Sequence, residues 1–149
     1  MPTSWTHNLY HAIVSTKGRA AVITPAVEEG LYACVGAILT DLRCTPIAIN
    51  GMPDHIHILA RYPSDLCHDE MVREVQQRSG AWIRETFPEL KGFAWQDGYG
   101  GFSVSKSMQE NIAAYIRKQD RHHLLKTSLE ELEGFLQKYG VEYDPERLE

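Results

Sequence analysis

Polar and apolar residues alternate through residues 6–15, and this two-residue period predicts a first β-strand. One face of the strand would carry His7, Leu9, His11 and Ile13, and the other Asn8, Tyr10, Ala12 and Val14. The turn Lys17-Gly18-Arg19 then ends the strand.

Two longer segments carry apolar residues at helical spacing. Residues 26–43 follow Thr24 and Pro25, an N-cap residue and a proline suited to the first helical position. Residues 66–87 form the second predicted helix, which Pro88 helps to end. Between the helices we expect a short strand over residues 45–50, a connection over residues 50–54 and a strand over residues 55–59. These two strands would form an antiparallel pair.

The last third of the chain predicts one more strand and two more helices. Residues 93–105 are strand-like, but three glycines interrupt them, so we expect a bend or bulge. The segments Ser107 to Glu110 and Ser128 to Glu131 each match a capping box, and Gly140 would close the second of these helices.

The predicted order is strand, helix, strand, strand, helix, strand, followed by the extra helices. This order is typical of the ferredoxin-like βαββαβ sandwich, an α+β fold with two helices on one face of a four-stranded antiparallel sheet. The length of 149 residues suits one domain, so we treat residues 1–149 as a single unit. This arrangement supports many functions, so the fold alone does not identify the chemistry.

Composition narrows the classes of function. The formal net charge of -5 disfavours a protein that holds long duplex DNA by charge alone. The three cysteines, Cys34, Cys44 and Cys67, lack a Cys-x-x-Cys spacing, which favours a reducing compartment over a disulfide framework or a thiolate metal site. The longest apolar run, residues 33–39, is too short to cross a bilayer, and the N-terminal residues do not resemble a signal peptide. We therefore expect a cytoplasmic protein.

The first candidate for chemistry is the pair His55 and His57. Because strand side chains alternate, the two imidazoles share a face, with their roots about 7 Å apart. Imidazole is the commonest protein ligand for transition metals, so the pair is a candidate for binding one divalent ion. Alone, His-x-His on a strand is more often a pair of solvent-facing polar residues.

The second candidate is the pair Tyr115 and Gln119, which lie four residues apart and would share one face of the third helix. If that helix lies across the sheet, the Gln119 carbonyl would be a third ligand for Mg²⁺ or Mn²⁺, and substrate phosphate oxygens would complete the site. Tyr115 would then be the nucleophile toward a phosphodiester. The ordinary alternatives are a packing tyrosine and a solvated glutamine.

A basic cluster surrounds the end of this helix, and it comprises Arg117, Lys118, Arg121, His122, His123 and Lys126. Cations are favoured at a helix C-terminus, and here they could also hold DNA phosphates. The alternative is a solvated helix end. Within this cluster we take Arg117, Lys118, Arg121, His122 and His123 as DNA-binding candidates, and we add Lys17 and Arg19 from the first turn.

These residues resemble those of the single-tyrosine HUH transposases, the small enzymes of simple insertion sequences and their REP-associated relatives. His55-Ile56-His57 resembles the HUH motif, and Tyr115-Ile-Arg-Lys-Gln119 resembles the nucleophile helix with its metal-binding glutamine. Further short matches run in order along the chain, at residues 10–17, 50–54, 95–105, 119–123 and 140–144.

The resemblance implies a ferredoxin-like fold, a homodimer with possible sharing of active sites, and Mg²⁺ or Mn²⁺ bound by His55, His57 and Gln119. It implies nicking of single-stranded DNA beside a hairpin, with Tyr115 forming a 5′-phosphotyrosine and the strands rejoined later without ATP. The family usually has a lysine within the second helix, where this chain has Gln76-Gln77-Arg78. Because this departure weakens the expected DNA contacts, one alternative is a non-catalytic or domesticated DNA-binding regulator of the same descent. Two separate alternatives are a small-molecule-binding ferredoxin-like module and Tyr99 as the nucleophile.

Overall fold

The computed structural model describes residues 4–119 and 127–148. The strands are β1 (Asn8–Ser15), β2 (Thr45–Met52), β3 (His55–Tyr62) and β4 (Gly100–Val104). The α-helices are α1 (Pro25–Asp41), α2 (His68–Thr86), α3 (Gln109–Arg117) and α5 (Ser128–Lys138). Short 3-10 turns at Lys17–Arg19, Pro88–Leu90, Lys106–Met108 and Pro145–Arg147 complete the described elements.

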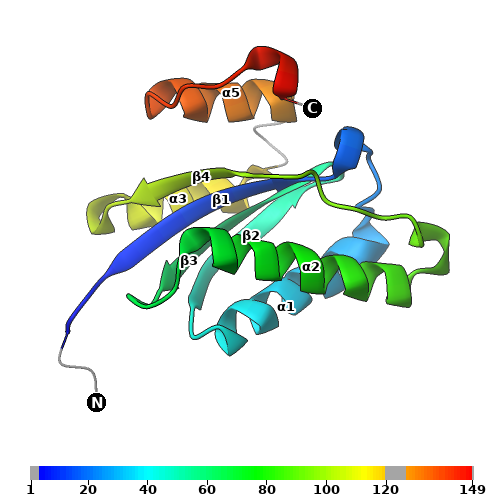
Figure 1. Ribbon diagram of the computed structural model, residues 1–149, viewed down its shortest axis with the longest axis horizontal. Coiled ribbons are helices and arrows are strands. Elements are labelled where there is room, and N and C mark those ends of the chain that lie inside the picture. Colours follow the sequence, from blue (N-terminus) through cyan, green and yellow to red (C-terminus); the bar gives the residue numbers. More distant parts are fainter. Residues whose placement is uncertain (1–3, 120–126, 149) are drawn as a thin grey trace.

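The strands form one sheet in the order β2-β3-β1-β4, and every neighbouring pair is antiparallel. Helices α1 and α2 lie together on one side of this sheet, and α5 lies on the opposite side (Figure 1). This confirms the predicted α+β, ferredoxin-like architecture. Its extra helix α5 adds a layer over the face that α1 and α2 leave open.

Side-chain alternation divides the two central strands between two environments. On β1 and β3, residues such as Val14, Ile56 and Ile58 point toward α1 and α2, where they join the main hydrophobic core. Their neighbours Leu9 and Leu59 point the other way and pack with Ile112, Ala113 and Ile116 of α3. His55 and His57 therefore belong to the face that α3 and α5 cover.

The hairpin between β2 and β3 places the first histidine. Met52 pairs directly with His55, so only Pro53 and Asp54 connect the strands, and the connection is shorter than expected. A Cβ at Gly51 would lie 2.2 Å from the His55 carbonyl oxygen, so any residue with a side chain at this position would clash with the backbone of β3. The close backbone approach fixes where β3 begins.

Three predictions for the last third of the chain were wrong in detail. The strand expected over residues 93–105 is ordered as a strand only at Gly100–Val104, with one isolated bridge between Thr16 and Trp95. Ser107 lies in a 3-10 turn, bonds to Ser105 and does not cap α3. The second capping box starts one residue earlier than predicted, at Thr127, and pairs it with Glu130. Gly140 does follow the end of α5, with a positive φ of 65°.

Within residues 4–119 and 127–148, none of the helices combines the length and the hydrophobicity needed to cross a membrane.

Candidate active site

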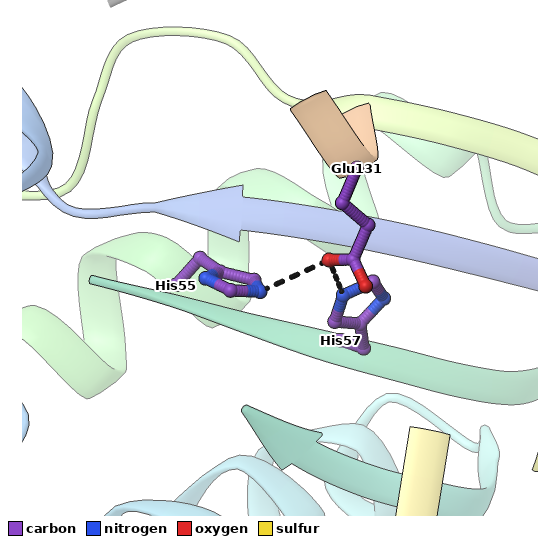
Figure 2. Close-up of side chains that lie close together, drawn as sticks. All are labelled: His55, His57 and Glu131. Atoms are coloured by element: carbon purple, nitrogen blue, oxygen red, sulfur yellow. Dashed lines mark hydrogen bonds and ion pairs between the residues drawn. The ribbon is translucent and has the colours of Figure 1, made fainter. Parts of the chain in front are cut away.

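The two histidines of β3 form the floor of the candidate site. Both side chains are fully buried, and both rings point away from the main core toward α5 (Figure 2). Their ring centroids lie 5.2 Å apart. Burial contradicts the reading of two solvent-facing polar residues, and buried imidazoles need polar partners.

Glu131 of α5 provides that partner. Its Oε1 atom lies 2.7 Å from Nε2 of His57 and 3.2 Å from Nε2 of His55. Dashed lines mark both contacts in Figure 2. The carboxylate is itself only 1% exposed. One oxygen from a helix 76 residues downstream of His55 in the sequence thus lies at the point where the two ring nitrogens converge.

The Tyr115 and Gln119 side chains meet at the same carboxylate. The Tyr115 hydroxyl donates a hydrogen bond to Oε2 of Glu131, and Nε2 of Gln119 donates one to the same oxygen at 3.1 Å. Oε1 of Gln119 lies 3.2 Å from Nε2 of His55. Helix α3 ends at Arg117, so Gln119 lies beyond it and does not share its regular helical face as predicted. The two side chains converge nonetheless.

Further polar residues hold the histidines from behind. Nδ1 of His55 lies 2.7 Å from Oδ1 of Asp54, and Nδ1 of His57 lies 2.8 Å from Nε2 of buried His11. The other Asp54 oxygen accepts a hydrogen bond of 2.7 Å from Ser128, the first residue of α5. Each histidine is thus fixed through one ring nitrogen, which leaves Nε2 directed at the site.

The charges in the site depend on each other. Burial alone would lower the pKa of His55, but the hydrogen bonds to the Asp54 and Glu131 carboxylates outweigh it and raise that pKa to about 9. Burial raises the pKa of Glu131, but hydrogen bonds from His55 and His57 lower it overall. Burial, reinforced by nearby His57, lowers the pKa of His11 to about 3, so this imidazole is neutral at ordinary pH.

Tyr115 is half-buried, and its phenol is not acidic in this arrangement. Burial, together with the hydrogen bond to the Glu131 carboxylate, raises the pKa of Tyr115 above its ordinary value. A tyrosine in this environment stays protonated unless a positive charge approaches its oxygen. The phenol therefore needs a cation nearby, or a base that takes its proton, if it is to act as a nucleophile.

The donor set suits such a cation. His55, His57 and Glu131 each offer a ligand atom, and these three atoms all lie within 4.8 Å of one another. The Gln119 amide oxygen adds a fourth donor beside His55. Two imidazole nitrogens with amide and carboxylate oxygens fit a divalent ion such as Mn²⁺ or Mg²⁺.

A groove leads from the surface to this point. It has a volume of about 330 Å³ and lies between α3 and α5, and its lining includes Tyr115, Glu131 and Lys138. The centroid of the Tyr115 ring lies 6.0 Å from the centroid of the His57 ring. Tyr99, the alternative nucleophile, packs instead against the core beneath α1 and α2. Among the described tyrosines, Tyr115 is thus the one hydrogen-bonded to the carboxylate between the histidines.

The predicted DNA-binding residues differ in exposure, and some of them lie outside the described part of the chain. Lys17, Arg117 and Lys118 are exposed. Arg19 is half-buried, and its guanidinium donates hydrogen bonds to the hydroxyls of Ser15 and Ser128 at 3.2 and 3.3 Å, so it braces the start of α5. The predicted contacts Arg121, His122 and His123 lie outside the described residues.

Sequence reasoning missed three residues of this site, namely Glu131, Asp54 and His11. In the sequence, Glu131 fits the predicted capping box, which is a sufficient local explanation for its charge. Asp54 falls in the predicted connection over residues 50–54, where an aspartate is expected. His11 carried a usable signal, because it lies on the same face of β1 as Leu9 and Ile13, but a single histidine on a strand does not indicate a partner.

Comparisons with known proteins identify the family of this chain. The family model described as "Transposase IS200 like" matches residues 4–119. The ISDra2 transposase TnpA of Deinococcus radiodurans is 27% identical over 115 residues, which cover 74% of this chain and 82% of that protein.

Two solved structures have a similar fold. A crystal structure assigned to a transposase from Deinococcus radiodurans is 27% identical with a TM-score of 0.67, covering 80% of this chain and 95% of that one. The REP-associated tyrosine transposase bound to a REP hairpin is 15% identical with a TM-score of 0.58, covering 78% and 70%. The family match extends over most of the chain and confirms the resemblance predicted from the motifs, so this protein belongs to the IS200-like, single-tyrosine HUH transposases and is a DNA-cleaving enzyme of transposition.

Proposed function

We propose that this transposase nicks and rejoins single-stranded DNA beside a hairpin, with Tyr115 as the nucleophile and a 5′-phosphotyrosine as the intermediate. One observation carries the proposal. The pairs His55/His57 and Tyr115/Gln119 come from distant parts of the sequence, and all four residues contact the same Glu131 carboxylate. A packing tyrosine and a solvated glutamine would have no reason to meet there.

The chemistry follows from the arrangement. The Tyr115 hydroxyl gives its proton to solvent water, its oxygen attacks the phosphorus, and the bond between phosphorus and the 3′ oxygen breaks. The leaving 3′ oxygen takes a proton from water and becomes a free 3′-hydroxyl. Because one phosphodiester has replaced another, a DNA 3′-hydroxyl can later attack the phosphotyrosine and release Tyr115 without ATP.

A divalent cation is part of this proposal, and His55, His57 and Gln119 would hold it. When bound, Mg²⁺ or Mn²⁺ would polarise a phosphodiester oxygen and offset the charge that develops during the attack. The protein fixes the direction of the ligands: Asp54 and His11 lock the two rings from behind.

The DNA would enter through the groove between α3 and α5, which leads to Tyr115. The exposed side chains of Lys17, Arg117 and Lys118 would contact phosphates, and unpaired bases would stack on aromatic residues. Recognition of a hairpin follows from the resemblance and agrees with the hairpin-bound relative of similar fold. We also propose a homodimer, in which each chain can assemble its own site, because Tyr115 lies beside His57 of the same chain.

A trapping assay tests the proposal. The full-length protein is incubated with hairpin-bearing single strands labelled on the 3′ side of the cleavage point, with Mn²⁺, and covalent adducts are resolved on a denaturing gel. We expect an adduct that EDTA abolishes and that Tyr115→Phe reduces by at least about 1,000-fold. The matched variant Tyr99→Phe should retain it.

Two results would overturn the proposal. An adduct that persists in Tyr115→Phe would remove this residue as the nucleophile. Hairpin binding without any adduct in the wild type would instead support the non-catalytic regulator.

A further inference from the structure

We infer that Glu131 is a fourth protein ligand of the divalent cation and, through its second oxygen, holds the Tyr115 hydroxyl beside it. This inference rests on the proposed function and extends it to a residue of α5. It makes α5 part of the active site, where the sequence had suggested only an additional helix.

The two carboxylate oxygens have separate partners. Oε1 lies 2.7 and 3.2 Å from the Nε2 atoms of His57 and His55, the atoms through which the imidazoles would bind a cation. Oε2 accepts hydrogen bonds from Tyr115 and Gln119. A cation bound by Oε1 and the two rings would therefore have the nucleophile held by the other oxygen of the same carboxylate.

The balance of charge also favours this role. Two neutral imidazoles and an amide leave the full charge of a divalent ion uncompensated, and Mg²⁺ and Mn²⁺ prefer oxygen ligands with negative charge. Glu131 supplies one such oxygen. It is 1% exposed, and a carboxylate so deeply buried is stable only where cations or hydrogen-bond donors surround it.

Helix α5 is fixed so that Glu131 reaches this position. The Thr127 and Glu130 side chains cap its N-terminus, and Ser128 is bonded to Asp54 and Arg19. Further along, Leu132, Phe135 and Leu136 pack with Ile13 and Phe102 on the sheet. Polar anchors before Glu131 and apolar anchors after it hold the carboxylate over the histidines.

The first test measures binding of Mn²⁺ alone to the full-length protein by titration calorimetry, without DNA. We expect Glu131→Gln to weaken Mn²⁺ affinity by at least tenfold, because an amide replaces the anionic ligand. Glu133→Gln is the matched control: it makes the same change on the same helix, and Glu133 is bonded to Tyr143 instead. It should bind Mn²⁺ like the wild type.

A second measurement separates positioning of the phenol from binding of the metal. At saturating Mn²⁺, Glu131→Gln should still form the adduct at least tenfold more slowly than Glu133→Gln. If Glu131→Gln binds Mn²⁺ as tightly as the wild type, the carboxylate is not a ligand. If Glu131→Gln forms adduct faster than Glu133→Gln, the carboxylate does not hold the phenol in position for attack. If the wild type forms no adduct at all, the proposed function fails, and the Mn²⁺ titration still decides the role of Glu131.

A third measurement needs no variant and so does not depend on the fold of one. Crystals of the wild type soaked in Mn²⁺ should show an anomalous peak roughly 2.1 Å from Oε1 of Glu131 and near both histidines. A peak on the histidines with Glu131 turned away would overturn the inference.

Discussion

The two faces of the sheet share the same strands but bury different kinds of side chain. Beneath α1 and α2, the strands bury an apolar core that includes Val14, Ile56 and Ile58. On the other face, His11, His55 and His57 lie between two small apolar clusters, one under α3 and one under α5. The first face gains stability from burial, whereas the second buries polar groups that must each find a partner.

The difference shows how one small domain combines stability with reactivity. The core beneath α1 and α2 holds the strands in register, so β3 presents its histidines at fixed spacing whatever covers them. The opposite face is closed by α3 and α5, which supply Tyr115 and Glu131. A change under α1 and α2 should therefore alter folding, and a change under α5 should alter metal binding and chemistry.

The largest expected effect is the loss of folding stability when a side chain of the main apolar core is truncated. Leu31 of α1 is fully buried in the main core, so Leu31→Ala should lower the free energy of unfolding by about 3 to 5 kcal/mol. Urea denaturation measures this loss. The Mn²⁺ affinity of the remaining folded protein should stay within about twofold of the wild type. A large loss of that affinity would show that the two faces are not independent.

The next effect is a pH dependence of the metal-free protein. The pKa of His55 rises from its ordinary 6.5 to about 9 on folding, so its contribution is complete below about pH 6.5 and is lost as the pH rises through 9. This contribution is at most about 3 kcal/mol. Asp54 and Glu131 have lowered pKa values, so their contributions are lost in acid. The pKa of His11 falls from 6.5 to about 3 on folding, so stability also declines as the pH drops below about 6.5, and it should peak near pH 6.5.

Urea denaturation in EDTA at pH 6, 7.5 and 9 measures this dependence. Glu131→Gln should flatten the decline above pH 6.5, because it removes one of the two carboxylates that raise the pKa of His55. Equal stability of the wild type at pH 6 and pH 9 would contradict the assigned pairing.

The smallest effect concerns the support behind His55. Asp54→Asn keeps an oxygen for Nδ1 of His55 and a polar partner for Ser128, but it removes the negative charge. Loss of such a supporting carboxylate should weaken Mn²⁺ binding by about tenfold. Asp65→Asn, an exposed aspartate paired with Arg43, is the control and should change nothing in the Mn²⁺ titration. If the two variants behave alike, Asp54 does not orient the ring.

Prediction from the sequence succeeded where the pattern was local. The alternation in β1 and β3 placed His55 and His57 on one face, and the spacing of residues 26–43 gave α1 within two residues at each end. The four-residue separation of Tyr115 and Gln119 suggested that they act together, and their side chains do meet, although α3 ends between them. Their roles as nucleophile and ligand remain predictions.

Prediction failed where a residue had a sufficient local explanation. Ser128 and Glu131 fit a capping box, but Thr127 and Glu130 form it, one residue earlier. Each residue turns a helix by about 100°, so this shift gives Glu131 a different direction from the one a cap requires. A sequence contains both possibilities, and only packing against the sheet selects between them.

The sequence by itself determined the order of the elements, the face of β3 that carries the histidines, and the family, because these depend on periodicity and on short motifs. Tertiary structure alone decided that a carboxylate of α5 lies between the two imidazoles and that His11 and Asp54 support them from behind. The physical reason is that such contacts join residues 46 to 76 positions apart, or depend on how a turn is closed, and no local pattern fixes the orientation of one element over another.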